Sequence, residues 1–236
     1  MTGGRAALWS FVAPHVARAQ QAPIRILFVG NSLTFWNDGL WVHLERLAAS
    51  GTPPVTVTTG RSVVPGAFLK SLWTRSDARR AIAAGPYDVV VLQEDLPETN
   101  VEDFREHAHL FVAEVRKAGA RPVLLMAWAY QRLGWINMDG IASAHRAAAA
   151  ELEADVAPVG LAWQRASELR PDLNLYAPDR EHPSIHGTYL ATAVVYATIF
   201  DRSPSGFSYS PPAVVGNDGR FLQNVAWETV QAYRKV

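Results

Sequence analysis

Short runs of aliphatic and β-branched residues alternate with longer segments of helical periodicity along most of this chain. The runs predict five strands, which are Ile24–Val29, Val55–Thr59, Val89–Leu92, Pro122–Ala127 and Val156–Val159. This alternation is typical of a parallel sheet, because each crossover between parallel strands needs a connection about as long as a helix. We therefore predict an α/β fold with a parallel sheet of about five strands, covered by helices on both faces.

The segments between and after the strands carry apolar residues at spacings of three and four, which predicts helices. The predicted helices are Asp38–Ala49, Ala67–Ala84, Val101–Ala118, Asp139–Ala154, Leu161–Leu169, Gly187–Phe200 and Phe221–Arg234. Glycines follow two of them, Gly51 and Gly119, and a glycine in that place is a common helix stop. No repeat and no linker-like stretch divides the series, so we predict a single domain over residues 23–236.

Residues 1–22 have a different character. Arg5 is followed by the mostly apolar stretch 6–16 and then by Ala17-Arg18-Ala19. This order suits a signal peptide, although a proline and a histidine interrupt the apolar stretch. A signal peptide would make the protein periplasmic or secreted, and the alternative is an N-terminal extension of a cytoplasmic protein. No other segment has the ~18 consecutive apolar residues that a membrane-spanning helix requires.

The charge balance and the lack of cysteine exclude several kinds of chemistry. Lysine plus arginine and aspartate plus glutamate both number 22, so the formal net charge is +0. This balance gives no electrostatic reason to expect a nucleic acid or an anionic membrane as partner. Because the sequence contains no cysteine, thiolate catalysis, disulfides and cysteine-ligated zinc are excluded. The oligomeric state stays open.

Polar residues directly follow several of the predicted strands. These groups are Gly30-Asn31-Ser32, Gly60-Arg61-Ser62, Gln93-Glu94-Asp95 and Trp128. In open α/β sheets, ligands bind outside the carboxyl ends of the strands. We therefore expect the functional site at this edge of the sheet.

Ser32 permits two interpretations. It follows a strand and precedes a helix, and serine is a preferred N-cap residue. Its hydroxyl could also be a nucleophile at the edge of the sheet. Serine is a poor nucleophile by itself, so this second interpretation requires an adjacent base and a third group that orients the base.

A candidate base lies in the later segment "APDREHPSIHGTYL". Asp179 and His182 are three residues apart, so the carboxylate can turn back onto the imidazole and fix its tautomer. A metal site is the competing interpretation, with His182 and His186 as ligands and Asp179 and Glu181 nearby. Pro183 disfavours a regular helix through both histidines, and no His-Glu-x-x-His motif is present. We therefore expect no metal.

Five further residues are candidates for the site. The amide of Gln93 could donate a hydrogen bond to an oxyanion, or it could be a loop or capping residue. Arg61 and Trp128 could line a substrate cleft, as could Trp36 and Trp135, although tryptophans are more often part of a core or its rim. Neither a Gly-x-Ser-x-Gly elbow nor a phosphate-binding glycine motif is present.

Taken in order, "ILFVGNSLT", "VVVLQEDLP" and "DREHPSIHGTYL" resemble the conserved blocks of the SGNH-type hydrolases, the GDSL-like lipase/esterase superfamily. The resemblance extends from Ile26 to about Tyr196. It implies a flavodoxin-like, three-layer α/β/α fold and a Ser-His-Asp hydrolase that needs no cofactor.

By this resemblance, Ser32 is the nucleophile, His182 the general base and Asp179 its partner. The implied oxyanion hole consists of the Ser32 N–H, a backbone N–H of Gly60 or Arg61, and Gln93. The usual third block, Gly-x-Asn-Asp, is replaced here by Leu-Gln-Glu-Asp. The sequence is thus similar to a branch in which glutamine takes the place of the asparagine donor.

The resemblance implies an esterase that acts on a small acyl ester, with acetyl as the leading candidate and a carbohydrate as a candidate alcohol portion. An acyltransferase with the same triad is the alternative, because fold does not determine the acceptor. A non-catalytic carbohydrate-binding relative and a metal hydrolase are less favoured, since Ser32, His182 and Asp179 occur together.

Overall fold

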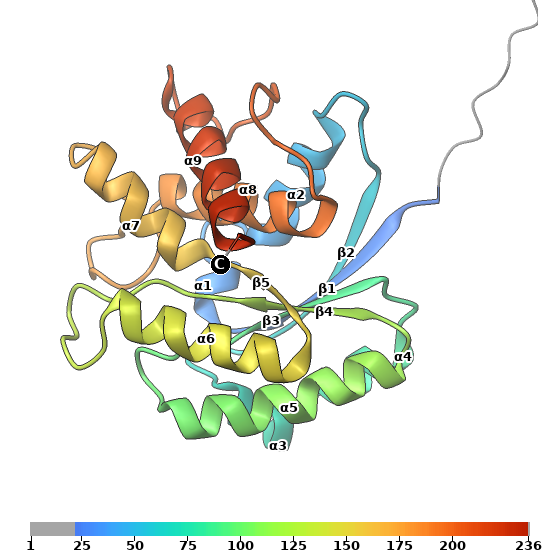
Figure 1. Cartoon of the computed structure of the whole chain (residues 1–236). Helices are drawn as coiled ribbons and strands as arrows, with labels where there is room; N and C mark the ends of the chain where they lie inside the picture. Colours follow the sequence, from blue (N-terminus) through green and yellow to red (C-terminus); the bar gives the residue numbers. More distant parts are fainter. Residues whose placement is uncertain (1–21, 236) are drawn as a thin grey trace, which may run out of the picture.

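A parallel sheet of five strands forms the centre of the molecule, in the order β2-β1-β3-β4-β5 (Figure 1). The strands are β1 (Ile24–Gly30), β2 (Val57–Val63), β3 (Val89–Gln93), β4 (Arg121–Leu125) and β5 (Asp155–Ala157). The computed structural model describes residues 22–235, and the predicted signal peptide or N-terminal extension therefore falls outside the described residues, apart from residue 22. The predicted α/β fold is confirmed.

Helices cover both faces of the sheet, and a short helix, α1 (Ser32–Phe35), follows β1. One layer contains α2 (Leu40–Ala49), α7 (Val159–Leu169), α8 (Ile185–Phe200) and α9 (Asp218–Tyr233). The other contains α3 (Leu69–Arg75), α4 (Ala78–Ala84), α5 (Val101–Lys117) and α6 (Met138–Leu152). Figure 1 shows the first layer above the sheet and the second below it.

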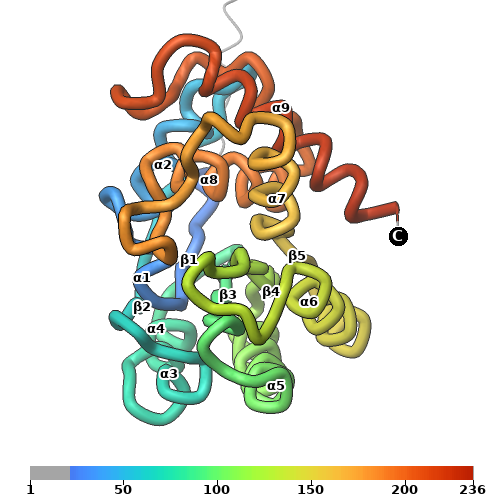
Figure 2. The backbone as a smooth tube through the Cα atoms, turned by 90° about the vertical axis from the view of Figure 1, so that its left-hand side faces the viewer, coloured from blue at the N-terminus to red at the C-terminus, as the bar shows by residue number. Residues whose placement is uncertain are grey.

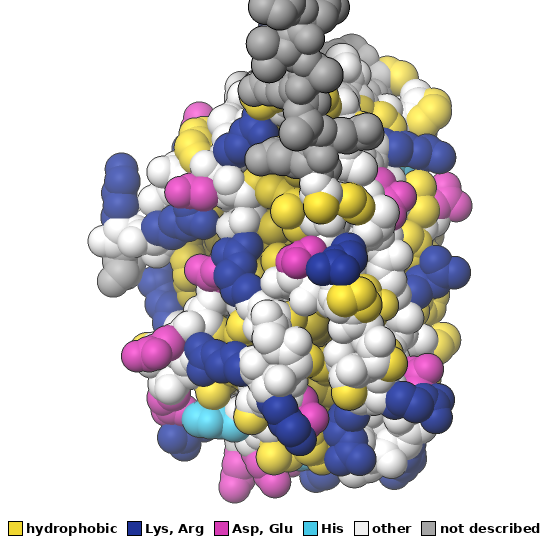
Figure 3. Space-filling model, turned by 90° about the vertical axis from the view of Figure 1, so that its right-hand side faces the viewer, with side chains coloured by type: hydrophobic (Ala, Val, Ile, Leu, Met, Phe, Trp, Pro, Cys, Tyr) yellow, Lys and Arg dark blue, Asp and Glu magenta, His cyan; other side chains and the backbone are white. Residues whose placement is uncertain are grey.

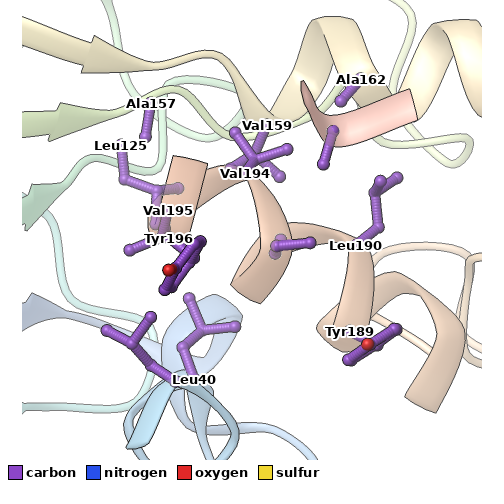
Figure 4. Close-up of a cluster of buried hydrophobic side chains, with 14 of the residues drawn as sticks. Leu40, Leu125, Ala157, Val159, Ala162, Tyr189, Leu190, Val194, Val195 and Tyr196 are labelled. Atoms are coloured by element: carbon purple, nitrogen blue, oxygen red, sulfur yellow. The ribbon is translucent and has the colours of Figure 1, made fainter. Parts of the chain in front are cut away.

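Each face of the sheet has its own hydrophobic core. Side chains alternate between the faces of a strand, so Ile26 and Phe28 pack with the α2 and α8 layer, whereas Leu27 and Val29 pack with the α5 layer. Helix α8 lies between the sheet and α9, and its middle is buried on all sides. Tyr196 lies near Leu40 of α2 in this core (Figure 4).

Two elements differ from the sequence-based predictions. The predicted helix Ala67–Ala84 is two helices, and Ser76 between them turns its hydroxyl toward both, donating to the Leu72 oxygen and accepting from the Ala78 N–H. The second strand continues to Val63 instead of ending at Thr59, so Gly60 lies inside it. A side chain at Gly60 would meet the Tyr87 hydroxyl 2.3 Å away, so this glycine is explained by close packing and not by a turn.

The order of the strands indicates where a ligand should bind, at the carboxyl ends of β1 and β3. The chain adds β2 on one side of β1 and then β3 on the other, so the connections leave β1 and β3 in opposite directions. Ligands of open α/β sheets bind at such a point, outside the carboxyl ends. Figure 2 looks onto this edge, with α1 beside the end of β1.

At the opposite edge, basic and acidic side chains are interspersed (Figure 3). Two ion pairs join the starts of neighbouring strands there, Arg25 with Asp88 and Arg121 with Asp155. Among residues 22–235, no helix combines the length and the apolar character needed to cross a membrane.

Candidate active site

Ser32 is the first residue of α1, directly beyond the end of β1, and it is 9% exposed. The helix is capped by its neighbour Asn31, whose Oδ1 accepts a hydrogen bond from the Leu33 N–H at 3.0 Å. The capping role that a serine could have filled is therefore taken by Asn31. This leaves the Ser32 hydroxyl available for another contact.

That contact is with His182, which lies in the segment between α7 and α8. The Ser32 Oγ and the His182 Nε2 are 2.8 Å apart, and the His182 Nδ1 is 2.8 Å from Oδ2 of Asp179. An ionised carboxylate can only accept, so Nδ1 carries the proton and Nε2 of the neutral ring accepts from the serine hydroxyl. The three predicted catalytic residues are thus joined in one hydrogen-bonded chain.

Asp179 also organises the backbone of its own turn. Its Oδ1 accepts from the N–H groups of Glu181 and His182, both at 3.0 Å. Desolvation opposes ionisation of the Asp179 carboxyl, but these backbone hydrogen bonds and the bond from the His182 ring outweigh it, so the pKa of Asp179 lies below its usual value. The carboxylate is therefore ionised over the neutral pH range, as an orienting partner must be.

The segment 177–182, here called the base loop, is anchored to the end of β4. The Trp128 Nε1 donates to the backbone oxygen of Glu181 at 2.9 Å, and the Gln131 N–H donates to that of Arg180 at 3.0 Å. Trp128 is only 1% exposed and stacks on Trp163. Trp128 also lines a pocket together with Trp163 and Tyr176, so its role in substrate binding stays a prediction.

Gln93 ends β3 and lies beneath the Ser32 turn, fully buried. Its Oε1 accepts from the Asn31 N–H at 2.8 Å, which fixes the orientation of the amide. Its Nε2 has no hydrogen-bond partner among residues 22–235. A side chain at Gly30 would come within 2.6 Å of the Gln93 Oε1, so the glycine permits this close approach.

A buried polar network next to Gln93 was not anticipated from the sequence. The Asn31 Nδ2 donates to Oδ2 of Asp95 at 2.9 Å, and the Tyr130 hydroxyl donates to the other oxygen, Oδ1, at 2.6 Å. Asp95 is 2% exposed, and desolvation raises its pKa to about 6. The polar block Gln93-Glu94-Asp95 was noted in the sequence, but its partners lie far away along the chain.

Glu94, beside Asp95, is buried as well. Its carboxyl oxygens accept from the backbone N–H groups of Asp95, at 2.7 Å, and Leu69, at 3.2 Å. Desolvation raises the pKa of Glu94 to about 8. The side chain is therefore mainly protonated at neutral pH and links the end of β3 to the start of α3.

The pairing of β1 with β2 places Gly60 and Arg61 away from the triad, which argues against a backbone oxyanion donor from either residue but not against Arg61 as a cleft residue. In the β1–β2 ladder Gly60 pairs with Leu27, whereas Gly30 pairs with Val63. Three residues of strand span about 10 Å, so Gly60 lies too far upstream to supply an oxyanion donor. The segment after Val63 comes closer, because the Asn31 Nδ2 donates to the Ala67 oxygen at 3.1 Å.

Arg61 pairs with Phe28 in the same ladder, and its guanidinium lies over the Trp41 ring, 5.0 Å from the centroid. With Phe35 and Arg46 it lines an open groove of about 790 Å³ beside α1. Arg61 therefore lines this groove, whereas Ser32 does not.

The structure does not assemble the metal site that was the competing interpretation of the His182 segment. His186 Nε2 faces Oδ2 of Asp218 in α9 at 3.4 Å, whereas His182 contacts Ser32 and Asp179. The described residues bring one other set of candidate metal ligands together, Asp103, Glu106 and His107 of α5. Asp103 already pairs with Lys70 there.

The fold is similar to those of several solved structures, and one of them is also similar in sequence. A protein from Slackia heliotrinireducens described as an SGNH hydrolase is 30% identical, with a TM-score of 0.63, over 75% of this chain and 100% of that chain. A DUF4886 family protein from Bacteroides uniformis has a TM-score of 0.72 at 18% identity, over 89% and 95% of the two chains.

An acetyl-xylooligosaccharide esterase from Geobacillus has a TM-score of 0.59 at 16% identity, over 81% of this chain and 100% of that chain. At this low identity, the likeness concerns the fold. No protein-family model and no curated protein matches the sequence. Because the Slackia protein is matched over its whole length at 30% identity, this chain belongs to the SGNH hydrolase family and is a serine hydrolase that acts on ester bonds.

Proposed function

We propose that the protein is an esterase that hydrolyses a small acyl ester, most simply an acetyl ester, through a Ser32-His182-Asp179 triad and an acyl-enzyme. The observation that carries the proposal is the chain of two 2.8 Å contacts from the Ser32 hydroxyl through the His182 ring to the Asp179 carboxylate. A serine becomes nucleophilic when a base is oriented in this way.

In the proposed reaction, His182 Nε2 takes the hydroxyl proton while the Ser32 Oγ attacks the ester carbonyl carbon. The carbonyl electron pair moves onto the oxygen and gives a tetrahedral oxyanion. When this collapses, the bond to the alcohol breaks and His182 gives its proton to the leaving oxygen. Water then attacks the acyl-enzyme by the same route, which releases the acid and returns the proton to Ser32.

We propose that the oxyanion is stabilised by the Ser32 N–H, by Gln93 and by a backbone N–H of the segment 64–67. The Gln93 Oε1 is committed to the Asn31 N–H, so the amide nitrogen is the group with hydrogen-bonding capacity to spare. A preorganised donor that gains its partner only as charge develops favours the transition state over bound substrate.

A carbohydrate is the alcohol portion that we favour. The acetyl-xylooligosaccharide esterase from Geobacillus shares the fold, as does an acetyl xylan esterase with a TM-score of 0.61. The groove lined by Trp41 and Arg61 lies beside α1, the helix that begins with Ser32, and offers an aromatic ring and a cation, which suits a polar and bulky group.

The test is turnover by a Ser32→Ala variant across p-nitrophenyl esters of increasing length and acetylated xylo-oligosaccharides. We expect the variant to lose at least about a thousandfold in kcat, since loss of a triad member has effects of this order. Ser62→Ala is the matched control, because Ser62 is also a buried serine with a carboxylate partner, Asp77 at 2.7 Å.

A Ser32→Ala variant that keeps more than about a tenth of the wild-type rate would contradict the proposal, given the losses typical of triads. The same assay separates hydrolysis from acyl transfer. Release of free acetate in the presence of an added sugar indicates an esterase, whereas transfer of the acetyl group to that sugar indicates an acyltransferase.

A further inference from the structure

The loop between α1 and α2, residues 36–39, lies against the segment that carries His182. We propose that this 36–39 loop positions the catalytic base, and that Asn37 is the positioning residue that ties the nucleophile's side of the site to the base's side. The inference rests on the proposed triad and concerns how its geometry is maintained.

The Asn37 side chain bridges the two parts of the chain that supply the triad. Asn37 follows α1, which begins with Ser32. Its Nδ2 donates to the backbone oxygen of Pro183 at 2.9 Å and to Oγ1 of Thr188 in α8 at 2.8 Å. Pro183 directly follows His182, so one amide group joins the nucleophile's segment to the residue beside the base.

The backbone of the 36–39 loop adopts an unusual conformation. Asn37, Asp38 and Gly39 have φ values of 52°, 70° and 86°, all in the left-handed region. Asparagine and aspartate tolerate this region better than most residues, but they visit it mainly as single residues. Such a conformation persists only when its surroundings hold it in place.

His43 of α2 supplies part of that support. Its Nε2 lies 2.8 Å from the Asn37 backbone oxygen, and its Nδ1 lies 2.7 Å from the Tyr209 hydroxyl. Burial lowers the pKa of His43, which keeps the ring neutral near pH 7. A carbonyl can only accept, so Nε2 carries the proton and Nδ1 accepts from the tyrosine. One tautomer therefore satisfies both contacts.

Trp36, at the start of the loop, contacts the base itself. Its ring stacks on the His182 imidazole, with centroids 4.1 Å apart and planes 19° from parallel. Asp179 holds one edge of the imidazole through Nδ1, while the indole covers its face. Together these contacts restrict rotation of the ring away from Ser32.

The hydrogen bond from Asn37 to Pro183 is needed because the other contacts that hold the base loop come from a different strand. Trp128 and Gln131 fasten the loop to the segment that follows β4, whereas Ser32 follows β1. Strand β3 separates β1 from β4 in the sheet. Asn37 therefore provides an attachment to the nucleophile's own segment, and a displacement of an ångström between reacting groups can cost about a hundredfold in rate.

The experiment compares Asn37→Gly with Asn100→Gly. Glycine at position 37 removes the amide and keeps the left-handed backbone without strain. Asn100 is the matched control, since its side chain caps α5 by accepting from the Asp103 N–H at 2.8 Å. For both variants we would measure kcat and KM with p-nitrophenyl acetate, the rate of labelling by a fluorophosphonate, and the thermal unfolding midpoint.

We expect Asn37→Gly to lower kcat and the labelling rate about ten- to hundredfold while KM changes less than about threefold, because the amide acts on the base and not on substrate binding. Asn100→Gly should leave both rates within about twofold of wild type. Unchanged rates in folded Asn37→Gly, a loss confined to KM, or an equal loss in Asn100→Gly would overturn the proposal.

Trp36→Ala gives a second variant should Asn37→Gly fail to fold, with the exposed Trp135→Ala as its control. We expect kcat to fall for Trp36→Ala alone and to be largely restored in Trp36→Phe, which keeps an aromatic ring on His182. Equal kcat values for Trp36→Ala and Trp135→Ala would contradict the role of the loop. Ser32→Ala in the same assays shows separately whether the proposed function holds.

Discussion

The two halves of the triad are held by different kinds of contact. The Ser32 turn rests on buried polar groups, with Asn31 and Gln93 fully buried and Asp95 2% exposed. The base loop is held by one hydrogen bond from the buried Trp128 indole and, near the surface, by Arg132, which pairs with both Glu98 and Glu181.

Because of this difference, we expect mutations at the two places to affect stability and activity in different proportions. A buried polar group that loses its partner pays the full desolvation cost, so damage at the Ser32 turn should lower stability and activity together. Exposed ion pairs contribute little to stability. Loss of the ion pairs that hold the base loop should therefore lower activity more than stability.

The strongest test of this contrast is Asp95→Ala. It leaves the buried Tyr130 hydroxyl without its acceptor and removes one of the two acceptors of the Asn31 Nδ2, whose other acceptor is the Ala67 oxygen. We therefore expect the free energy of unfolding to fall by about 3 kcal/mol. Activity should fall with it, because Asn31 caps the helix that begins with Ser32. Chemical denaturation and kcat would be measured beside Asp77→Ala, an exposed aspartate, and equal losses of stability in both would refute the contrast.

Glu94→Gln tests the same buried region through the pH dependence of the free energy of unfolding. The pKa of Glu94 is raised to about 8 in the folded protein, so folding favours the protonated form. This contribution is complete below the unfolded-state pKa of about 4.5 and is lost as pH rises through about 8. We expect wild-type stability to decline across this window by a few kcal/mol, and the decline to be smaller in Glu94→Gln, which cannot ionise. An identical pH dependence in both proteins would show that Glu94 is ionised in the fold.

Trp128→Phe should distinguish the effect of Trp128 on the base loop from its contribution to the hydrophobic core. The substitution removes the hydrogen bond to the Glu181 oxygen and also leaves a cavity, which we expect to cost about 2 kcal/mol. Trp163→Phe is the matched control, since Trp163 stacks on Trp128 and is 2% exposed but has no hydrogen-bond partner for its Nε1 among the described residues. We expect similar stability losses in the two variants and a lower kcat only in Trp128→Phe.

The smallest effect on stability should come from Arg132→Gln. The guanidinium is about one-third exposed, so loss of its pairs should change the free energy of unfolding by less than about 1 kcal/mol. We expect a modest decrease in kcat, because Glu181 directly precedes His182. Arg165→Gln, which breaks the surface pair with Glu228, should leave kcat unchanged. A large loss of stability in Arg132→Gln alone would place this ion pair among the structural determinants of the fold.

The layer order and the strands could be predicted because their signal is local. Apolar runs bounded by polar or glycine residues mark buried strands wherever they occur, and β1 and β3 lie close to their predicted positions. Ser32, His182 and Asp179 were found for a related reason, since a short motif surrounds each of them. The structure brings these three together.

The remaining residues could not be assigned because their partners lie far away in the sequence. Gly60 has the same local pattern whether it ends a strand or makes room for Tyr87, and only the folded packing decides. Nothing next to Trp128 in the sequence indicates its hydrogen bond to the backbone oxygen of Glu181 in the base loop. Likewise, nothing next to Asn37 in the sequence indicates the Pro183 oxygen, which comes from the opposite end of the chain.

The most direct test of the account is covalent labelling of the wild-type protein with a fluorophosphonate, followed by intact-mass analysis and peptide mapping. Because the Ser32 hydroxyl contacts a base that Asp179 orients, we predict one adduct per molecule, located on Ser32. We predict labelling at least about a hundredfold slower in His182→Ala, as expected for loss of a triad base. An adduct on another serine, or labelling of Ser32 that is equally fast without His182, would contradict the triad.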